Sequence, residues 1–296
     1  MASVQDLKRR IRSVRNTRKI TKAMELVASA RLRRAQARIE AMRPYADRML
    51  ELMAGTARAS VSLGRLPLLQ RREPKTAAIL AVTGDRGLAG AFNAQILRRA
   101  FSLGRELERE GTNVRWLVAG KKGRSTLRFR GHEPLSEWTG FSDRPAYSDA
   151  QAVAHKLADL YVEGEIDRVV VVYNHFESAL VQSVVEQEVL PIPEHLLETD
   201  EEERREDALR GDFIYEPEPE EILARLLPVY LETEIYRALL ESAASEQGAR
   251  MTAMRNASKN AGELIDNLTL AMNRARQAEI TQEILEVVGG AEALTA

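Results

Sequence analysis

Apolar residues recur at alternating spacings of three and four along the start of the chain, a pattern typical of a helix that packs against another helix. The series consists of Val4, Leu7, Ile11, Val14, Ala28, Leu32, Ala35, Ile39 and Met42. Strong helix formers continue to Met53, and Pro44 should kink the helix rather than end it. The pattern predicts one long coiled-coil helix over residues 1–60.

The frame changes character in the middle of this helix. There it falls on three polar residues, Arg18, Thr21 and Glu25. The apolar residues of the same stretch move to a neighbouring helix face: Ile20, Met24 and Val27. The sequence therefore predicts a coiled-coil seam that is locally displaced.

A second long helix is predicted over residues 217–290. Prolines and acidic residues at its start suit a helix N-terminus. Its heptad frame of small and flexible residues consists of Met251, Met254, Ser258, Ala261, Ile265, Leu268, Met272 and Ala275. After Ala275 a different apolar stripe begins, formed by Ile280, Ile284 and Val287. Pro228 predicts a kink, and Gly289 with Gly290 predicts the point where the helix frays.

Between the two helices, residues 75–216 alternate strand and helix patterns. Strands are predicted at 77–83, 115–120, 168–174 and 181–192, and the third is apolar enough to be buried on both faces. A helical pattern covers residues 150–164. The alternation indicates a Rossmann-like α/β domain. The acidic segment 198–212 is predicted to be a mobile surface loop.

The economical fold is α/β with a long antiparallel coiled coil, in which the N- and C-terminal helices pair and the α/β domain lies between them in sequence. Roughly 55 residues of the first helix span about 80 Å, and roughly 70 of the second span about 105 Å. The segment beyond Gln277, called the tip below, should therefore be unpaired. Because an isolated apolar stripe is adhesive in water, another protein should surround the tip.

Charge is balanced overall but not along the chain. The 296 residues include 43 basic and 44 acidic ones, yet residues 1–44 hold 13 Lys and Arg against 3 Asp and Glu. The absence of cysteine excludes disulfides and thiol chemistry. No apolar run approaches the roughly 20 residues of a membrane-spanning helix, so a soluble or peripheral protein without direct membrane insertion is expected.

The motifs offer little chemistry. Gly84, Gly87 and Gly90 follow a predicted strand, but their spacing is GxxGxxG and no Lys-Ser or Lys-Thr pair follows, so a structural turn is favoured over a nucleotide site. Residues 119–126, AGKKGRST, are read as a basic loop. The four histidines have no metal-ligand spacing, and no GxSxG motif is present. We expect no catalytic residue, cofactor or metal.

The basic first helix favours a specific anionic partner over a merely solvated face. Nucleic acid is one such partner, bound through its phosphates, and a basic coiled-coil nucleic-acid-binding protein is the alternative interpretation of the chain. Residues 1–44 contain no aromatic side chain for stacking, which argues against single-stranded nucleic acid.

Four segments together resemble the gamma subunits of F-type ATP synthase. They are RIRSVRNTRKITKAMELVASARLRRAQ from Arg10, TGDRGLAGAFN from Thr83, SEQGARMTAMRNASKNAGELI from Ser245 and ARQAEITQEILEVVGGAEAL from Ala275. The resemblance covers both ends of the chain and the first turn of the middle domain, in the family's order.

The resemblance implies a non-catalytic rotor subunit whose coiled coil is the central shaft inside a ring of alternating alpha and beta subunits. Its α/β domain would lie against the epsilon subunit and the membrane rotor ring. Such a subunit transmits torque and so couples proton flow to ATP synthesis or hydrolysis, with no role for nucleic acid. The implied location is peripheral, on the cytoplasmic face of a bacterial cell membrane.

The resemblance also assigns roles residue by residue. Torque contacts with the catalytic ring fall on Met24, Arg250, Arg276, Gln277, Thr281 and Glu283. The apolar residues that would turn in a bearing are Ile280, Ile284, Val287 and Val288. Two departures stand out: Ala89 replaces a cysteine common in the family, and the chain has no cysteine for the thiol regulation that chloroplast relatives carry in an inserted segment, which favours a bacterial source.

Overall fold

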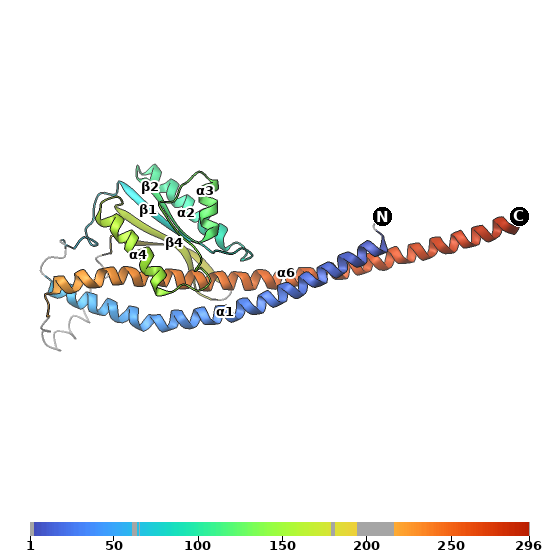
Figure 1. Cartoon of the computed structure of the whole chain (residues 1–296), viewed down its shortest axis with the longest axis horizontal. Helices are drawn as coiled ribbons and strands as arrows, with labels where there is room; N and C mark the ends of the chain where they lie inside the picture. Colours follow the sequence, from blue (N-terminus) through green and yellow to red (C-terminus); the bar gives the residue numbers. More distant parts are fainter. Residues whose placement is uncertain (1–2, 61–63, 65, 179–180, 194–215, 296) are drawn as a thin grey trace. The chain divides into compact units, whose positions relative to one another are not determined.

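The computed structural model describes residues 3–60, 64, 66–178, 181–193 and 216–295. Its elements, in chain order, are α1 (Val4–Ala59), β1 (Thr76–Val82), α2 (Phe92–Arg109), β2 (Asn113–Ala119), α3 (Lys121–Phe129), β3 (Ser136–Trp138), α4 (Tyr147–Val162), β4 (Arg168–Phe176), β5 (Gln182–Leu190) and α6 (Pro219–Thr295). The predicted class, α/β with paired terminal helices, is confirmed (Figure 1). The acidic segment 198–212 lies outside the described residues.

The chain divides into two compact units, and both long helices contribute to each. Residues 1–29 and 250–296 form the two-helix unit, and residues 30–249 form the sheet unit. Residues 30–59 of α1 and 219–249 of α6, called the basal parts of these helices, therefore belong to the same compact body as the strands. The two units are described separately below.

The sheet unit is built on five strands in the order β3-β2-β1-β4-β5. β1, β2, β3 and β4 are parallel neighbours, and β5 pairs with β4 in the antiparallel direction. Every residue from Val169 to Asn174 in β4 is buried, which confirms the prediction that this strand is covered on both faces.

Side chains of β1 alternate between two cores because successive residues of a strand point to opposite faces. Ala78, Leu80 and Val82 enter the core shared with α4 and the basal parts of α1 and α6. Ala77, Ile79 and Ala81 enter the core beneath α2 and α3. The sheet is thus a middle layer between two layers of helix (Figure 1).

Two short elements differ from the sequence prediction. Residues 119–126, read as a basic loop, contain most of helix α3. Its first amides are capped from a distance, because Lys121 N donates to Asp85 Oδ1 at 3.0 Å and Gly123 N donates to Thr83 Oγ1 at 2.9 Å. Local sequence carries no such signal. The three-residue edge strand β3 was not predicted either.

The end of the second long helix also differs. α6 continues through Gly289 and Gly290 to Thr295, so the prediction of fraying at the glycine pair was wrong. Glycine costs about 1 kcal/mol relative to alanine inside a helix, which weakens a helix without ending it. Pro44 and Pro228 both lie inside their helices, as predicted.

Candidate functional site

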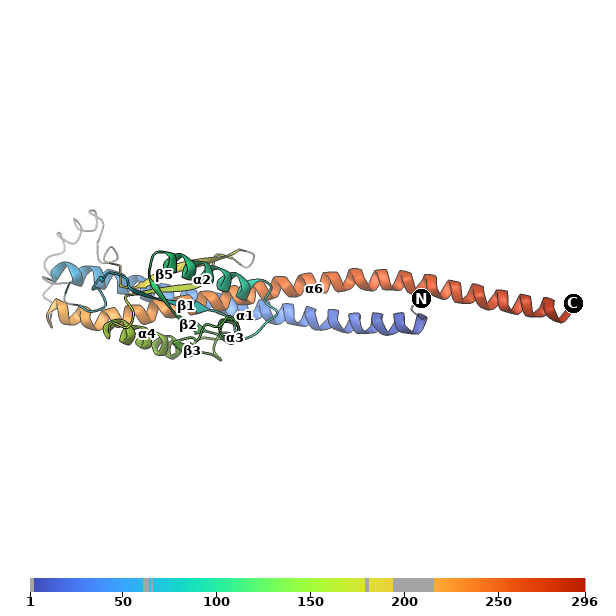
Figure 2. The ribbon, with the colours of Figure 1, turned by 90° about the horizontal axis from the view of Figure 1, so that it is seen from above.

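Two contacts fix how the helices pair in the two-helix unit. Arg255 Nε of α6 donates to Glu25 Oε1 of α1 at 3.2 Å, and a Cβ added at Gly262 of α6 would lie 3.7 Å from Arg18 Cζ of α1. Residue numbers rise along one helix as they fall along the other, so the pairing is antiparallel. The same offset places Val4, where α1 begins, beside residue 276. Figure 2 shows α6 continuing past that end of α1.

The seam between these helices is polar in its middle, and it is not displaced. Thr21 and Glu25 are buried, whereas Ile20 and Val27 are more than half exposed. The predicted local displacement of the seam was therefore wrong. The heptad frame continues through Thr21 and Glu25, whereas Arg18 is exposed, Ile20 and Val27 face outward and Met24 is half-buried.

Glu25 is held in the seam by two cations. Lys22 Nζ lies 2.9 Å from Glu25 Oε2, and Arg255 approaches the other carboxylate oxygen. The hydrogen bond from Lys22, with that from Arg255, lowers the pKa of Glu25 below its ordinary value although burial raises it. A charged side chain can be buried in a helix interface when it is paired with opposite charges, and Glu25 has two such partners.

The predicted tip residues lie on one uninterrupted, exposed length of α6. Ile280, Ile284, Val287 and Val288 are between 43 and 72% exposed, and no described residue of the chain covers this stripe. Arg276, Gln277, Thr281 and Glu283 are exposed on the same length of helix. Thr281 Oγ1 donates to Gln277 O at 2.9 Å, so its hydroxyl is used within the helix.

The other two predicted contacts are placed differently. Met24 is half-buried on α1, and the pairing offset sets it beside residue 256, about 30 Å along α6 from Arg276. Arg250 is buried, with 7% of its surface exposed. The candidate contacts therefore fall at two levels along the two-helix unit: an upper level at residues 276–283 and a lower level near Met24 and Arg250. Arg250 is covered by its own chain.

The basic residues in the first third of α1 face solvent. Eight are exposed between residues 8 and 22: Lys8, Arg9, Arg10, Arg12, Arg15, Arg18, Lys19 and Lys22. Beside them, Ile20, Leu26 and Val27 add exposed apolar area, which sequence reasoning did not include among the site residues. The spacing of four and seven from Ile20 to Met24 and Val27 was the available signal.

The glycine turn after β1 has a structural role. Gly84 N donates to Asn93 Oδ1 at 2.8 Å, and Asp85 N donates to Ser142 Oγ at 2.8 Å. A Cβ on Gly84 would lie 2.8 Å from Cδ of Glu246, a buried carboxylate of α6. Two amides that a phosphate would need are already used, and the nearby carboxylate would repel it, which favours the structural interpretation of the motif.

The segment SEQG of α6 is where the sheet unit attaches to the helix. Ser245 Oγ donates to Asn174 O at 3.2 Å, and Gln247 Nε2 donates to Asp143 Oδ1 at 2.9 Å. Together with Glu246 against Gly84, three consecutive residues contact β4, the loop before α4 and the turn after β1. This part of the recognised motif holds the domain on the helix.

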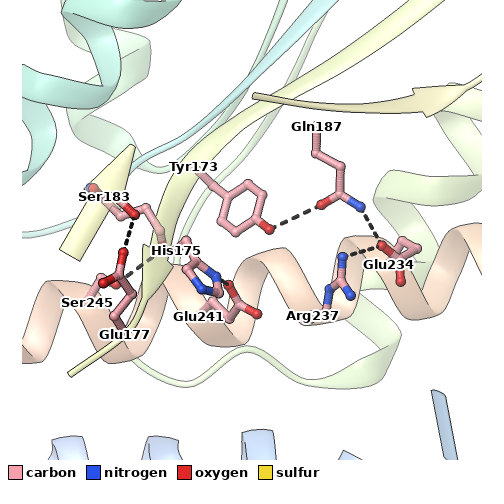
Figure 3. Close-up of polar contacts among 10 residues, drawn as sticks. Tyr173, His175, Glu177, Ser183, Gln187, Glu234, Arg237, Glu241 and Ser245 are labelled. Atoms are coloured by element: carbon pink, nitrogen blue, oxygen red, sulfur yellow. Dashed lines mark hydrogen bonds and ion pairs between the residues drawn. The ribbon is translucent and has the colours of Figure 1, made fainter. Parts of the chain in front are cut away.

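A polar chain joins β4 and β5 to the basal part of α6 (Figure 3). Tyr173 Oη donates to Gln187 Oε1 at 3.1 Å, and Arg237 Nη2 lies 2.7 Å from Glu234 Oε2. Gln187 also donates to Glu234. Burial raises the pKa of Glu234, with Arg237 opposing it. Beside this chain His175 Nδ1 contacts Glu241 Oε2 at 2.5 Å.

A second carboxylate of α6 is bound by α4. Glu232 accepts hydrogen bonds from Tyr147 Oη at 2.7 Å and Gln151 Nε2 at 3.0 Å, and His155 Nε2 lies 2.8 Å away. Burial raises the pKa of Glu232, but these hydrogen bonds together outweigh it, and the net shift is downward.

Neither metal ligation nor membrane spanning is supported in the part of the chain that the structure describes. No group of three or more His, Asp or Glu residues there could hold a metal ion. No helix among those residues is long and apolar enough to cross a membrane.

Comparison with known proteins points in one direction. The family model described as ATP synthase matches residues 3–294. The ATP synthase gamma chain of Moorella thermoacetica is 47% identical over 294 residues, covering 99% of this chain and all of the relative. That of Nostoc punctiforme is 44% identical over 315 aligned residues and covers both chains completely.

Solved structures agree. A chain in the central stalk and c-ring structure of the Tetrahymena thermophila mitochondrial ATP synthase is 29% identical, with a TM-score of 0.59 over 81% of this chain and 99% of that one. A chain in the OSCP/F1/c-ring structure of the Euglena gracilis enzyme has a TM-score of 0.68 over 98% of this chain and 94% of that one. Its 18% identity makes that a likeness of fold alone.

Proposed function

Because this chain belongs to the family of ATP synthase gamma chains, the non-catalytic subunits of the central stalk, we propose that it carries torque between a membrane rotor ring and a catalytic ring of alpha and beta subunits. Proton flow through the membrane part would turn it, and its asymmetric surface would drive the beta subunits through ATP synthesis, or be driven by them in hydrolysis. This role replaces the nucleic-acid alternative.

One observation carries the proposal: α6 continues beyond the end of α1 with an exposed apolar stripe from Ile280 to Val288. Covering such a stripe is favourable by roughly 25 cal/mol for each Å² of apolar surface removed from water. A collar of alpha and beta subunits would cover it. Apolar contact is non-directional, so the tip could turn there without strong bonds that hold one angle.

Torque needs directional contacts as well, and those would be made by the polar residues beside the stripe. Arg276, Gln277 and Glu283 are exposed and can form hydrogen bonds or ion pairs with passing loops of a beta subunit. Thr281 is exposed on the same length of helix. Met24 would act at the lower level.

Arg250 would serve differently from the other proposed contacts, because its own chain covers it. A beta loop would reach it only after local rearrangement. We assign it the weakest direct contact of the set.

The exposed cations of α1 fit the same surroundings. Eight Lys and Arg side chains between residues 8 and 22 produce a strong positive field along one stretch of helix. Acidic loops of the catalytic ring would be attracted to it at every angle, which keeps the shaft centred.

The epsilon subunit and the membrane ring would bind the sheet unit, and the whole complex would lie peripherally on the cytoplasmic face of a bacterial membrane. The bacterial relatives among the gamma chains support the source.

The proposal is tested by removing the tip in the assembled complex. A chain that stops after Gln277 should hydrolyse ATP in membrane vesicles but pump fewer protons per ATP, since the shaft has lost its bearing. The sheet unit should keep its cooperative thermal unfolding. A full-length control with alanine at Ile280, Ile284, Val287 and Val288 separates apolar contact from helix length. Unchanged pumping, or loss of the sheet unit's fold, would contradict the proposal.

A further inference from the structure

Asp143 bridges three separate parts of the sheet unit. It lies in the loop between β3 and α4, and its Oδ2 accepts a hydrogen bond from Arg31 Nη1 of α1 at 2.6 Å and forms an ion pair with Arg86 Nη1 of the turn after β1 at 3.0 Å. Its Oδ1 accepts one from Gln247 Nε2 of α6 at 2.9 Å. One carboxylate therefore links the sheet to both long helices.

The loop that carries Asp143 is itself fixed to the sheet. Asp85 Oδ2 accepts from Gly140 N at 2.9 Å and from Ser142 N at 3.1 Å. The other oxygen of Asp85 accepts from Lys121 N, the first residue of α3. A force applied to Asp143 therefore passes through Asp85 to the ends of β1 and α3 rather than into a loose loop.

Other polar contacts of the sheet unit, such as those of Asn174 with Ser245 and of Tyr147 with Glu232, join it to α6. Toward α1 the sheet unit also packs through the apolar core shared by α4, α1 and α6, and apolar packing resists separation more than it resists sliding or twisting. Hydrogen bonds weaken steeply when their angle changes, and bonds to ionised groups are the stronger class. The side chain of Asp143 is 25% exposed, so its bonds are only partly screened by water.

We propose that Asp143 is a positioning residue that transfers twist between the α/β domain and the paired helices α1 and α6. Load entering through the sheet would reach α1 through Arg31 and α6 through Gln247 at the same height. The two helices would then be turned together instead of sliding past each other. This inference rests on the proposed torque-carrying function.

Two variants test the inference in the assembled ATP synthase in membrane vesicles. Asp143→Ala removes the bridge, and Arg31→Ala removes only its link to α1. Arg31 is a partly exposed helix residue, so its loss should leave the chain folded even where Asp143→Ala does not. The matched control is Glu137→Ala, because Glu137 has similar exposure and binds Arg124 and Arg128 within the α/β domain only.

The first readout is the ratio of protons pumped to ATP hydrolysed. We expect it to fall in Asp143→Ala and Arg31→Ala and to remain at the wild-type value in Glu137→Ala, with Asp143→Asn between. The second readout is hydrogen exchange in the same complex. The amides of Gly140 and Ser142 stay bonded to Asp85, but in Asp143→Ala the loop that carries them loses its anchor to both helices, so they should exchange on the order of tenfold faster.

A wild-type pumping ratio in both Asp143→Ala and Arg31→Ala would overturn the inference. If the truncated variant that ends at Gln277 pumps fewer protons in the same assay, the proposed function survives and only the role of Asp143 is wrong. If that truncation also pumps normally, the torque-carrying function itself fails.

Discussion

Arg255 of α6 donates a hydrogen bond to Glu25 of α1 at 3.2 Å, joining two residues 230 positions apart in sequence. The contact lies at a heptad position where an apolar residue would be usual. A polar pair at such a position fixes the register of a coiled coil, because any slip leaves the carboxylate buried without its partner.

Replacing Glu25 by alanine should therefore destabilise the helix pair by up to about 1 kcal/mol, because Lys22 and Arg255 are more than half exposed and water can take over their hydrogen bonds. Thermal unfolding followed by circular dichroism measures it. Glu263→Ala is the control, since Glu263 is exposed and lies 4.0 Å from Lys259. Equal effects of the two variants would show that Glu25 does not hold the pair.

Gly84→Ala should destabilise the sheet unit by roughly 1–3 kcal/mol, as expected for overpacking. The new methyl group would lie 2.8 Å from Cδ of Glu246, and that side chain is buried and has little room to move. Gly87→Ala is the matched control, because its Cβ would be 3.7 Å from Lys122 Cε. Chemical denaturation of both variants checks the difference, and a neutral Gly84→Ala would contradict the close approach.

The hydrogen bonds to Glu232 predict a pH dependence. The folded-state pKa of this carboxyl is lowered from 4.5, so its stabilising effect is present above that value and is lost as pH falls through the folded-state pKa. The stability of the wild-type chain relative to Glu232→Gln should therefore decline below about pH 4.5. Denaturation midpoints of both proteins from pH 7 downward measure it. A constant difference would mean that the carboxylate contributes nothing through its charge.

The exposed stripe of the tip predicts a contrast between the free chain and the complex. Ile284→Ser should leave the thermal unfolding of the free chain unchanged, because Ile284 is 57% exposed. In the assembled complex the same change should lower coupling if alpha and beta subunits cover the stripe. Met254→Ser, at a buried seam position, should instead destabilise the free chain by roughly 2–5 kcal/mol. Destabilisation of the free chain by Ile284→Ser would show that the tip has an internal partner.

Periodicity was enough to predict the long helices and the paired fold, because their apolar positions repeat over many turns. The strands β1, β2, β4 and β5 were also predicted, since each has a run of apolar or alternating residues. Helix α3 and strand β3 were missed for two different reasons. α3 is capped by Thr83 and Asp85 from another turn, and β3 is too short to show a pattern.

The polar part of the seam could not be predicted from one helix alone. Thr21 and Glu25 interrupt the apolar heptad frame, and the partner of Glu25, Arg255, is known only once the register of two distant segments is known. The convergence of Arg31, Arg86 and Gln247 on Asp143 is likewise a product of tertiary structure. The tip was predicted by comparing helix lengths, a simpler quantity.

A single disulfide tests the rotor most directly. The chain contains no cysteine, so Glu283→Cys introduces a unique thiol that can be cross-linked to a cysteine placed in a beta subunit. The account predicts that the cross-link forms in the assembled complex and stops ATP turnover. Reduction of the disulfide should restore turnover. The same experiment at Met24 tests the lower level. Turnover that continues with the cross-link intact would show that this chain does not rotate against the catalytic ring.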